Sequence, residues 1–64
     1  MTIYTVEYRT VRDALGRAKT GYAVLENGRP YQTIVYATRP EAVSAAKATA
    51  QVRGSVAEYR EVNQ

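Results

Sequence analysis

Four basic residues gathered in one short segment carry the most evident chemistry of this chain. They are Arg9, Arg12, Arg17 and Lys19, and Asp13 is the one acid among them. The other five Lys and Arg residues are matched by five Glu residues, so the formal net charge of +3 is the charge of this segment. Clustered positive charge attracts anions, either the phosphates of a nucleic acid or an acidic protein surface, and does not choose between them.

The residue types that do most enzymatic chemistry are missing. The chain has no His, Cys or Trp, which removes the commonest general base, the thiolate nucleophile and the soft metal ligands. Glu58 and Glu61 could form a catalytic carboxylate pair, but they are better explained as solvated surface residues. Residues 26–28 lack the Gly-rich spacing and the Lys of a phosphate-binding loop, and an RNase-like group of Tyr, Arg and Glu needs a cleft that so small a domain rarely has. We expect a protein that is not an enzyme, without cofactor or metal.

The length predicts one domain over residues 1–64. A domain of this size buries only about 60% of the surface that its unfolded chain exposes. Without Cys or His, neither a disulfide nor the usual zinc site is available to reinforce it. Residues 1–8 alternate polar and apolar types, unlike a signal peptide, and no run approaches the roughly 20 apolar residues of a membrane span. We therefore expect a cytoplasmic protein of modest stability.

Three β-rich runs and a turn signal predict an antiparallel meander. Residues 3–10 alternate strictly, which predicts a half-buried strand with Tyr4, Val6 and Tyr8 on one face. The basic residues 11–19, which include Gly16, predict a long flexible loop. Two further strands are expected at residues 21–25 and 31–37, joined at Asn27-Gly28, because both residues tolerate the positive φ of a type I′ turn.

The register of this second hairpin has two alternatives, and each buries a different set of side chains. A two-residue turn places on one side Tyr22, Val24, Tyr31 and Val35. A three-residue bulged loop places on one side Tyr22, Val24, Ile34 and Tyr36. We favour the second register, because Tyr36 comes just before the predicted helix and can cover its first turn.

The clearest predicted element is a helix that ends at about Arg53. Thr38 as N-cap and Glu41 at N3 form a capping box, Pro40 is tolerated in the first turn, and Gly54 supplies a left-handed residue at the end. Its many alanines let it lie close to a sheet. A last strand over residues 56–62 is expected beside the first. The predicted fold is α+β, in the order β-β-β-α-β, with one helix packed on one face of a three-stranded antiparallel meander and a short final strand.

The six tyrosines divide into two expected groups. We expect Tyr4, Tyr8 and Tyr36 in the core. One or two of the other three, Tyr22, Tyr31 and Tyr59, are expected on the sheet face that the single helix leaves open, together with Thr5, Glu7 and Arg9. An open face or edge strand is where a small domain docks on a partner or dimerises.

Residues 21–50 resemble the arm-type DNA-binding domains of tyrosine recombinases. The resemblance lies in the hairpin G-Y-A-V-L-E-N-G-R-P-Y-Q-T-I-V and in Y-A-T-R-P-E-A before an alanine-rich helix. It extends to small bacterial and phage domains of unknown function with the same hairpin and helix. The arm domains carry Lys and Arg along the sheet, whereas residues 31–36 have none. In size and in the lack of catalytic groups the chain also resembles anti-CRISPR proteins.

These observations favour a phage-encoded binding protein that inhibits or modulates a host nucleic-acid machine, such as a CRISPR effector complex. The residues expected to contact the partner are Arg9, Arg12, Arg17, Lys19, Arg29 and Tyr31. The alternative is a domain that binds DNA or RNA directly. A third possibility is a self-assembling module that forms a homodimer through its sheet edge.

Overall fold

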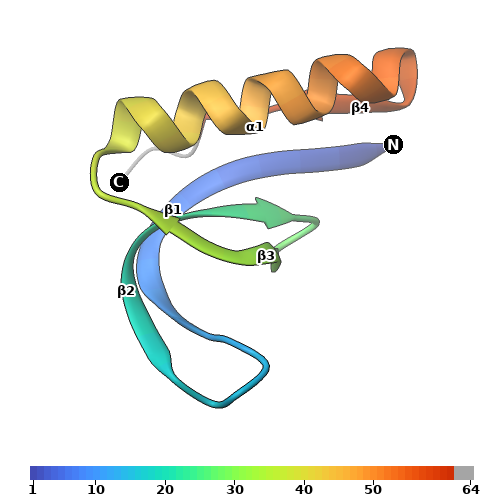
Figure 1. Cartoon of the computed structure of the whole chain (residues 1–64). Helices are drawn as coiled ribbons and strands as arrows, with labels where there is room; N and C mark the ends of the chain where they lie inside the picture. The colour runs from blue at the N-terminus through green and yellow to red at the C-terminus, as the bar shows by residue number, and fades with distance from the viewer. Residues whose placement is uncertain (62–64) are drawn as a thin grey trace.

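The computed structural model describes residues 1–61 and confirms the predicted fold class. Its elements are β1 (Thr2–Arg12), β2 (Ala18–Glu26), β3 (Arg29–Tyr36), α1 (Arg39–Arg53), a 3₁₀ turn η1 (Gly54–Val56) and β4 (Ala57–Tyr59). The sheet has the strand order β3-β2-β1-β4, in which the first three strands are antiparallel and β4 runs parallel to β1. Figure 1 shows α1 lying across the end of the sheet that contains the N-terminus.

The hairpin of β1 and β2 is longer than predicted. Val11 pairs with Lys19 and Arg12 pairs with Ala18, so the loop expected over residues 11–19 is reduced to residues 13–17. The strands continue because Thr10 and Thr20 face each other and their hydroxyl oxygens lie 2.8 Å apart. Cross-strand Thr pairs of this kind stabilise a ribbon.

The turn between β2 and β3 is the predicted two-residue turn, with φ of 51° at Asn27 and 86° at Gly28. Leu25 pairs with Pro30 next to it, as the first predicted register requires. An irregularity in β3 then shifts the pairing further than either register allows, so Tyr22 lies opposite Tyr36. Neither alternative describes the whole hairpin, but the second register's placement of Tyr22 and Tyr36 on one side of the sheet is confirmed.

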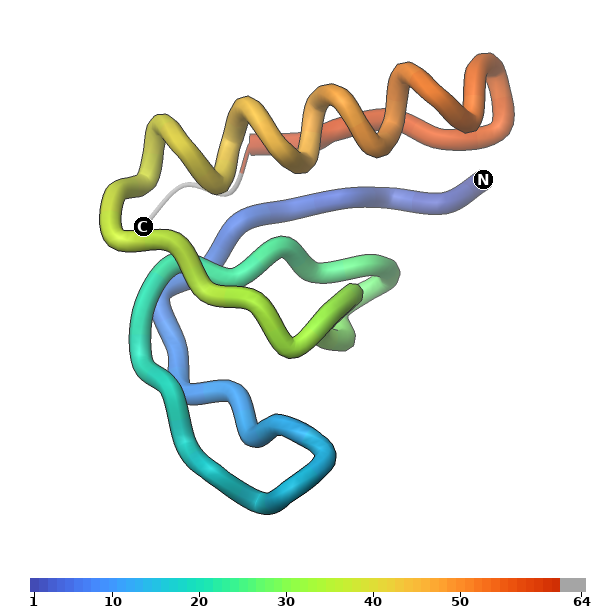
Figure 2. Tube along the Cα trace, in the orientation of Figure 1, coloured from blue at the N-terminus to red at the C-terminus, as the bar shows by residue number. Residues whose placement is uncertain are grey.

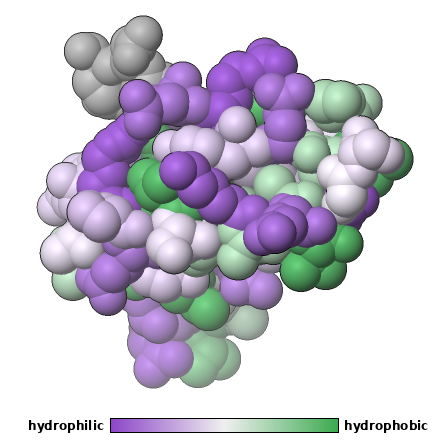
Figure 3. All heavy atoms as spheres, turned by 90° about the horizontal axis from the view of Figure 1, so that it is seen from above, coloured by the Kyte–Doolittle hydropathy of each residue, from purple (hydrophilic) through white to green (hydrophobic). Residues whose placement is uncertain are grey.

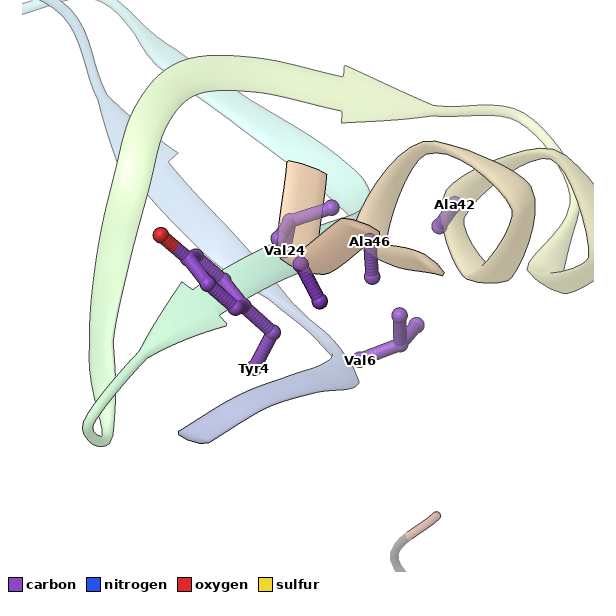
Figure 4. Close-up of a cluster of buried hydrophobic side chains, with 6 residues drawn as sticks. Tyr4, Val6, Val24, Ala42 and Ala46 are labelled. Carbon is purple, nitrogen blue, oxygen red and sulfur yellow. The ribbon is translucent and has the colours of Figure 1, made fainter. Parts of the chain in front are cut away.

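The main core lies between α1 and the end of the sheet that it covers. Three alanines one turn apart, Ala42, Ala46 and Ala50, are buried on one side of the helix. They pack on the buried side chains of the sheet, which are Tyr4, Val6 and Val24. Figure 4 shows the labelled side chains of this cluster meeting between the sheet and α1. Alanine lets the helix approach closely, and Tyr4 supplies most of the volume.

The helix ends largely as predicted. Thr38 is the N-cap, but its hydroxyl donates to Glu41 Oε1 (2.8 Å) and no side-chain bond reaches the backbone. The predicted capping box is therefore wrong in this detail. At the other end Gly54 has a φ of 70° and a ψ of −138°, and its N–H donates to the Gln51 carbonyl, so the predicted glycine ends the helix with a positive φ but not in the left-handed helical conformation.

Tyr4 ties three elements together through its hydroxyl. The hydroxyl donates to Glu26 Oε2 at 2.7 Å, and Arg53 Nη2 lies 3.4 Å from the same oxygen. The Tyr4 ring also meets Tyr31 edge-on, with centroids 5.6 Å apart. Burial, and secondly the hydrogen bond to Glu26, raises the pKa of Tyr4 to about 12, so the phenol stays neutral at physiological pH.

The final strand lies beside β1, as predicted, but it is shorter than predicted. Thr2 pairs with Ala57 and Tyr4 with Tyr59, whereas the prediction ran from residue 56 to 62. Val62 lies outside the described residues. No helix in the described part of the chain is long and apolar enough to cross a membrane.

The face of the sheet away from α1 is only partly open, which corrects one expectation: Glu7 is exposed on it, but its centre is buried. Val11, Ala23 and Leu25 are buried there against Val35. The reason is the strong bend of β1 and β2 in Figure 2, which closes this concave face on itself. Gly21 permits the bend, since a Cβ at this residue would lie 2.8 Å from the Tyr36 carbonyl oxygen.

Candidate functional site

The outer half of the first hairpin protrudes as a two-stranded ribbon. β3 pairs with β2 only from Tyr22 onward, and β4 pairs with β1 only as far as Tyr4. Residues 9–21, here called the basic ribbon, therefore extend beyond the rest of the sheet (Figure 1). The four predicted bases of the first segment all lie on it.

The bases are distributed around the basic ribbon. Strand pairing places Arg12 on the convex face, the one that carries Thr10 and Thr20. Arg9 and Lys19 lie on the concave face with Val11. A ribbon with positive charge on both faces is suited to entering a groove between anionic walls rather than to lying on a flat surface.

Asp13 organises the turn at the tip. Its Oδ1 accepts the backbone N–H groups of Leu15 (2.9 Å) and Arg17 (3.0 Å), and its Oδ2 accepts the Arg17 Nε–H (3.0 Å). The hydrogen bond from the Arg17 backbone is the main reason that the pKa of Asp13 is lowered. Arg12 Nη1 donates to the Gly16 carbonyl at 2.9 Å. The expected long loop is therefore wrong in its extent, because only residues 13–17 lie between the strands and they form a hydrogen-bonded turn.

The four basic side chains differ in their exposure to solvent and in the partners that they have within the protein. Arg17 is ion-paired with Asp13, although its side chain remains 70% exposed. Arg9 is half-buried, and its Nε has no hydrogen-bond partner in the part of the chain that is described. Lys19 is exposed and forms no salt bridge within residues 1–61. Lys19 is thus the base most available to a partner.

Two predicted contact residues lie away from the basic ribbon. Arg29 and Tyr31 lie at the start of β3. Arg29 lies opposite Glu26 in the backbone pairing of β2 and β3, at the other end of β2 from Lys19. Tyr31 is 36% exposed and packs against Tyr4. Arg29 and Tyr31 therefore do not lie in the same strand segment as the four bases.

An aromatic pair beside the basic ribbon was missed from the sequence. Tyr8 and Tyr22 face each other across the strands, with ring centroids 5.0 Å apart. With Val6, Glu7 and Arg39 they line a hollow of about 190 Å³. Tyr8 was predicted to be in the core, but it is 62% exposed and lies outside the buried cluster under α1. Arg39, at the start of α1, adds a cation to this surface.

Apart from Ile34 on β3, which is also exposed, two further places carry exposed apolar side chains. Leu15 is 77% exposed at the tip of the basic ribbon. Met1, Val52 and Val56 are exposed at the opposite end, where Figure 3 shows green surface near the N-terminus. Leu15 extends the basic ribbon with an apolar contact, whereas the second group lies apart from it.

Within residues 1–61, no three acidic side chains gather in a way that could hold a metal ion. No protein-family model matches the chain, and no significant match exists among curated proteins or solved structures.

Proposed function

We propose that this protein is a non-enzymatic inhibitor or modulator of a cytoplasmic nucleic-acid machine, such as a CRISPR effector complex in the host of a phage. The observation that supports this is the basic ribbon, which presents cations on both faces and an ordered turn at its tip. An ordered turn loses little conformational entropy on binding. Docking of the basic ribbon in an anionic groove of the complex would exclude the nucleic acid or protein that normally occupies it.

A nucleoprotein partner fits the charge better than a bare nucleic acid does. Asp13 offsets one of the four bases, and Arg17 is already paired with it. About three remaining phosphate contacts give a salt slope near 3, which supports only weak attachment. Further affinity has to come from apolar contacts, and Tyr8, Tyr22 and Leu15 are placed to make them.

Direct binding of DNA or RNA is the second candidate. A two-stranded β-ribbon is narrow enough to enter the major groove of DNA, and the basic ribbon has this form. This candidate requires affinity for bare nucleic acid that falls steeply with salt, without any protein partner.

Reversal of charge at Lys19 tests the proposal. We expect Lys19→Glu to weaken partner capture about tenfold or more, because it removes an exposed cation and adds a repelling anion. Lys47→Glu makes the same change in charge on the exposed side of α1, near Tyr59, and is the matched control. The measurement is affinity capture from nuclease-treated host lysate with the wild-type protein and both variants as baits.

Equal capture by the two variants contradicts docking through the basic ribbon. Complete loss of wild-type capture after nuclease treatment favours the second candidate instead. Arg17 is less suitable for this test, because its replacement also disturbs the turn built on Asp13.

A further inference from the structure

The tip of the basic ribbon holds an exposed leucine in a built turn. Leu15 is 77% exposed, and the turn between β1 and β2 lies at the end of the molecule away from α1 (Figure 1). A single exposed leucine is ordinary in itself. This one is distinguished by the hydrogen bonds and the cations around it.

Hydrogen bonds fix the backbone that carries Leu15. The Leu15 N–H donates to Asp13 Oδ1 at 2.9 Å, and the Gly16 N–H donates to the Asp13 carbonyl at 3.0 Å. Gly16 has a φ of 80°, and a short loop that ends in a left-handed glycine is a common hairpin connection. Leu15 is therefore held in one backbone conformation, which loses little entropy on binding.

Other polar groups of the turn are also paired within the chain. The Arg17 N–H donates to Asp13 Oδ1, and the Asp13 N–H donates to the Arg17 carbonyl, each at 3.0 Å. The Gly16 carbonyl accepts a hydrogen bond from Arg12 Nη1 at 2.9 Å. Because an unpaired polar group is costly to bury, a turn with paired groups is suited to an apolar pocket. The same pairing withholds these N–H groups from phosphates, which proteins often bind through the backbone.

Two guanidinium groups lie beside Leu15 in fixed directions. Arg12 uses Nη1 for the Gly16 carbonyl, and Arg17 uses Nε for Asp13 Oδ2. A guanidinium carries five N–H donors, so both side chains keep donors for an outside partner. A guanidinium that is held in place is suited to pairing with a carboxylate through two parallel hydrogen bonds.

We infer that the tip of the basic ribbon binds a protein groove that has carboxylates on its walls and an apolar pocket for Leu15. This inference rests on the proposed function and names the chemistry of the surface that is bound. Phosphates would neutralise the cations, but a sugar-phosphate backbone has no apolar pocket for a leucine. An acidic protein groove supplies both contacts.

The inference also identifies what is blocked. By charge complementarity, an acidic groove binds basic segments of other proteins. Occupation of such a groove by the basic ribbon would prevent a contact between two proteins of the nucleic-acid machine. The channel that holds the nucleic acid would remain open.

Leu15 and the cations are expected to affect different rate constants. Charges at an interface mainly raise the association rate constant, whereas contacts in a buried pocket mainly slow dissociation. We expect Leu15→Ala to raise the dissociation rate constant about tenfold or more and to leave the salt dependence of binding unchanged. Lys19→Glu should instead lower the association rate constant, most strongly at low salt.

Capture from nuclease-treated host lysate, followed by kinetics on the purified complex, measures these effects. Leu15→Met keeps the volume and the apolar character of the side chain, so it should bind like the wild type. Val52→Ala is the matched control, because Val52 is 88% exposed near the end of α1, far from the tip. Equal dissociation of Leu15→Ala and the wild type overturns the inference.

Nuclear magnetic resonance with defined probes tests the choice of protein over nucleic acid. The probes are poly-glutamate, a random copolymer of glutamate and tyrosine, and a short DNA duplex. We expect the Leu15 methyl resonances to shift most with the copolymer, because it offers both carboxylates and apolar rings. Larger shifts with the duplex would mean that Leu15 inserts between bases, as apolar side chains of minor-groove binders do, and would overturn the inference.

Failure of this inference is distinguishable from failure of the proposed function. If Lys19→Glu weakens capture and Leu15→Ala does not, the basic ribbon docks without an apolar pocket, and only the inference is wrong. If neither variant weakens capture, docking through the basic ribbon is itself contradicted.

Discussion

Tyr4→Ala is expected to remove a large part of the free energy of unfolding of this protein. Tyr4 is fully buried, and it joins the core between α1 and the sheet to the hydrogen bond with Glu26. Removal of a buried aromatic ring costs about 3–5 kcal/mol. A domain of 64 residues has a total stability of roughly 3–10 kcal/mol, so this loss takes between about a third and all of it.

Circular dichroism with urea and thermal unfolding measures this effect. Tyr4→Phe is the matched control, because it keeps the ring and removes only the hydroxyl. It should cost about 1.5–3 kcal/mol, the range for one hydrogen bond to a charged group. If Tyr4→Ala melts within a few degrees of the wild type, the core is not built on this residue.

Ala46→Leu is expected to have the second largest effect on stability. Ala46 is fully buried and packs in the cluster that holds Val6 and Val24. A leucine has no space there, so the helix must move away from the sheet, which costs about 1–3 kcal/mol. In a domain of this size the melting temperature would fall by roughly 4–20 °C.

Ala48→Leu provides the matched control on the same helix. Ala48 is exposed, so the same side chain should change stability by no more than about 0.5 kcal/mol. Thermal unfolding of both variants gives the comparison. Equal melting temperatures would show that α1 does not depend on close packing at Ala46.

The periodic patterns predicted the fold well where local rules decide the structure. The alternation of residues 3–10 predicted buried Tyr4 and Val6, and Asn27-Gly28 predicted a turn with positive φ at both residues. The same alternation failed at Tyr8, because burial there depends on how far α1 extends over the sheet. The length of a helix relative to a sheet is a tertiary property that alternation does not contain.

The candidate site was predictable in composition but not in arrangement. The clustering of four bases is visible in the printed chain, whereas their division between the two faces follows from where β1 and β2 end. The capture of Arg17 by Asp13 depends on the geometry of one turn. The irregularity in β3 has no sequence signal that we can identify, and it decides which tyrosines meet.

The fold explains how so small a chain can present a protruding ribbon. The helix and the Tyr4 cluster stabilise one end of the sheet, and Val11, Ala23 and Leu25 brace the bend at the other. The basic ribbon therefore needs no third strand beyond Tyr22. This leaves its tip and its convex face available for a partner, together with the exposed Lys19 on the concave face.

Photo-cross-linking from the tip of the basic ribbon tests docking most directly. Leu15, exposed at the tip, and Ala48, exposed on α1, would each be replaced by p-benzoylphenylalanine, and the proteins irradiated in host lysate before nuclease treatment. We expect a discrete protein adduct from position 15 and none from position 48. An adduct from position 48 alone, or from neither position, would contradict docking through the basic ribbon.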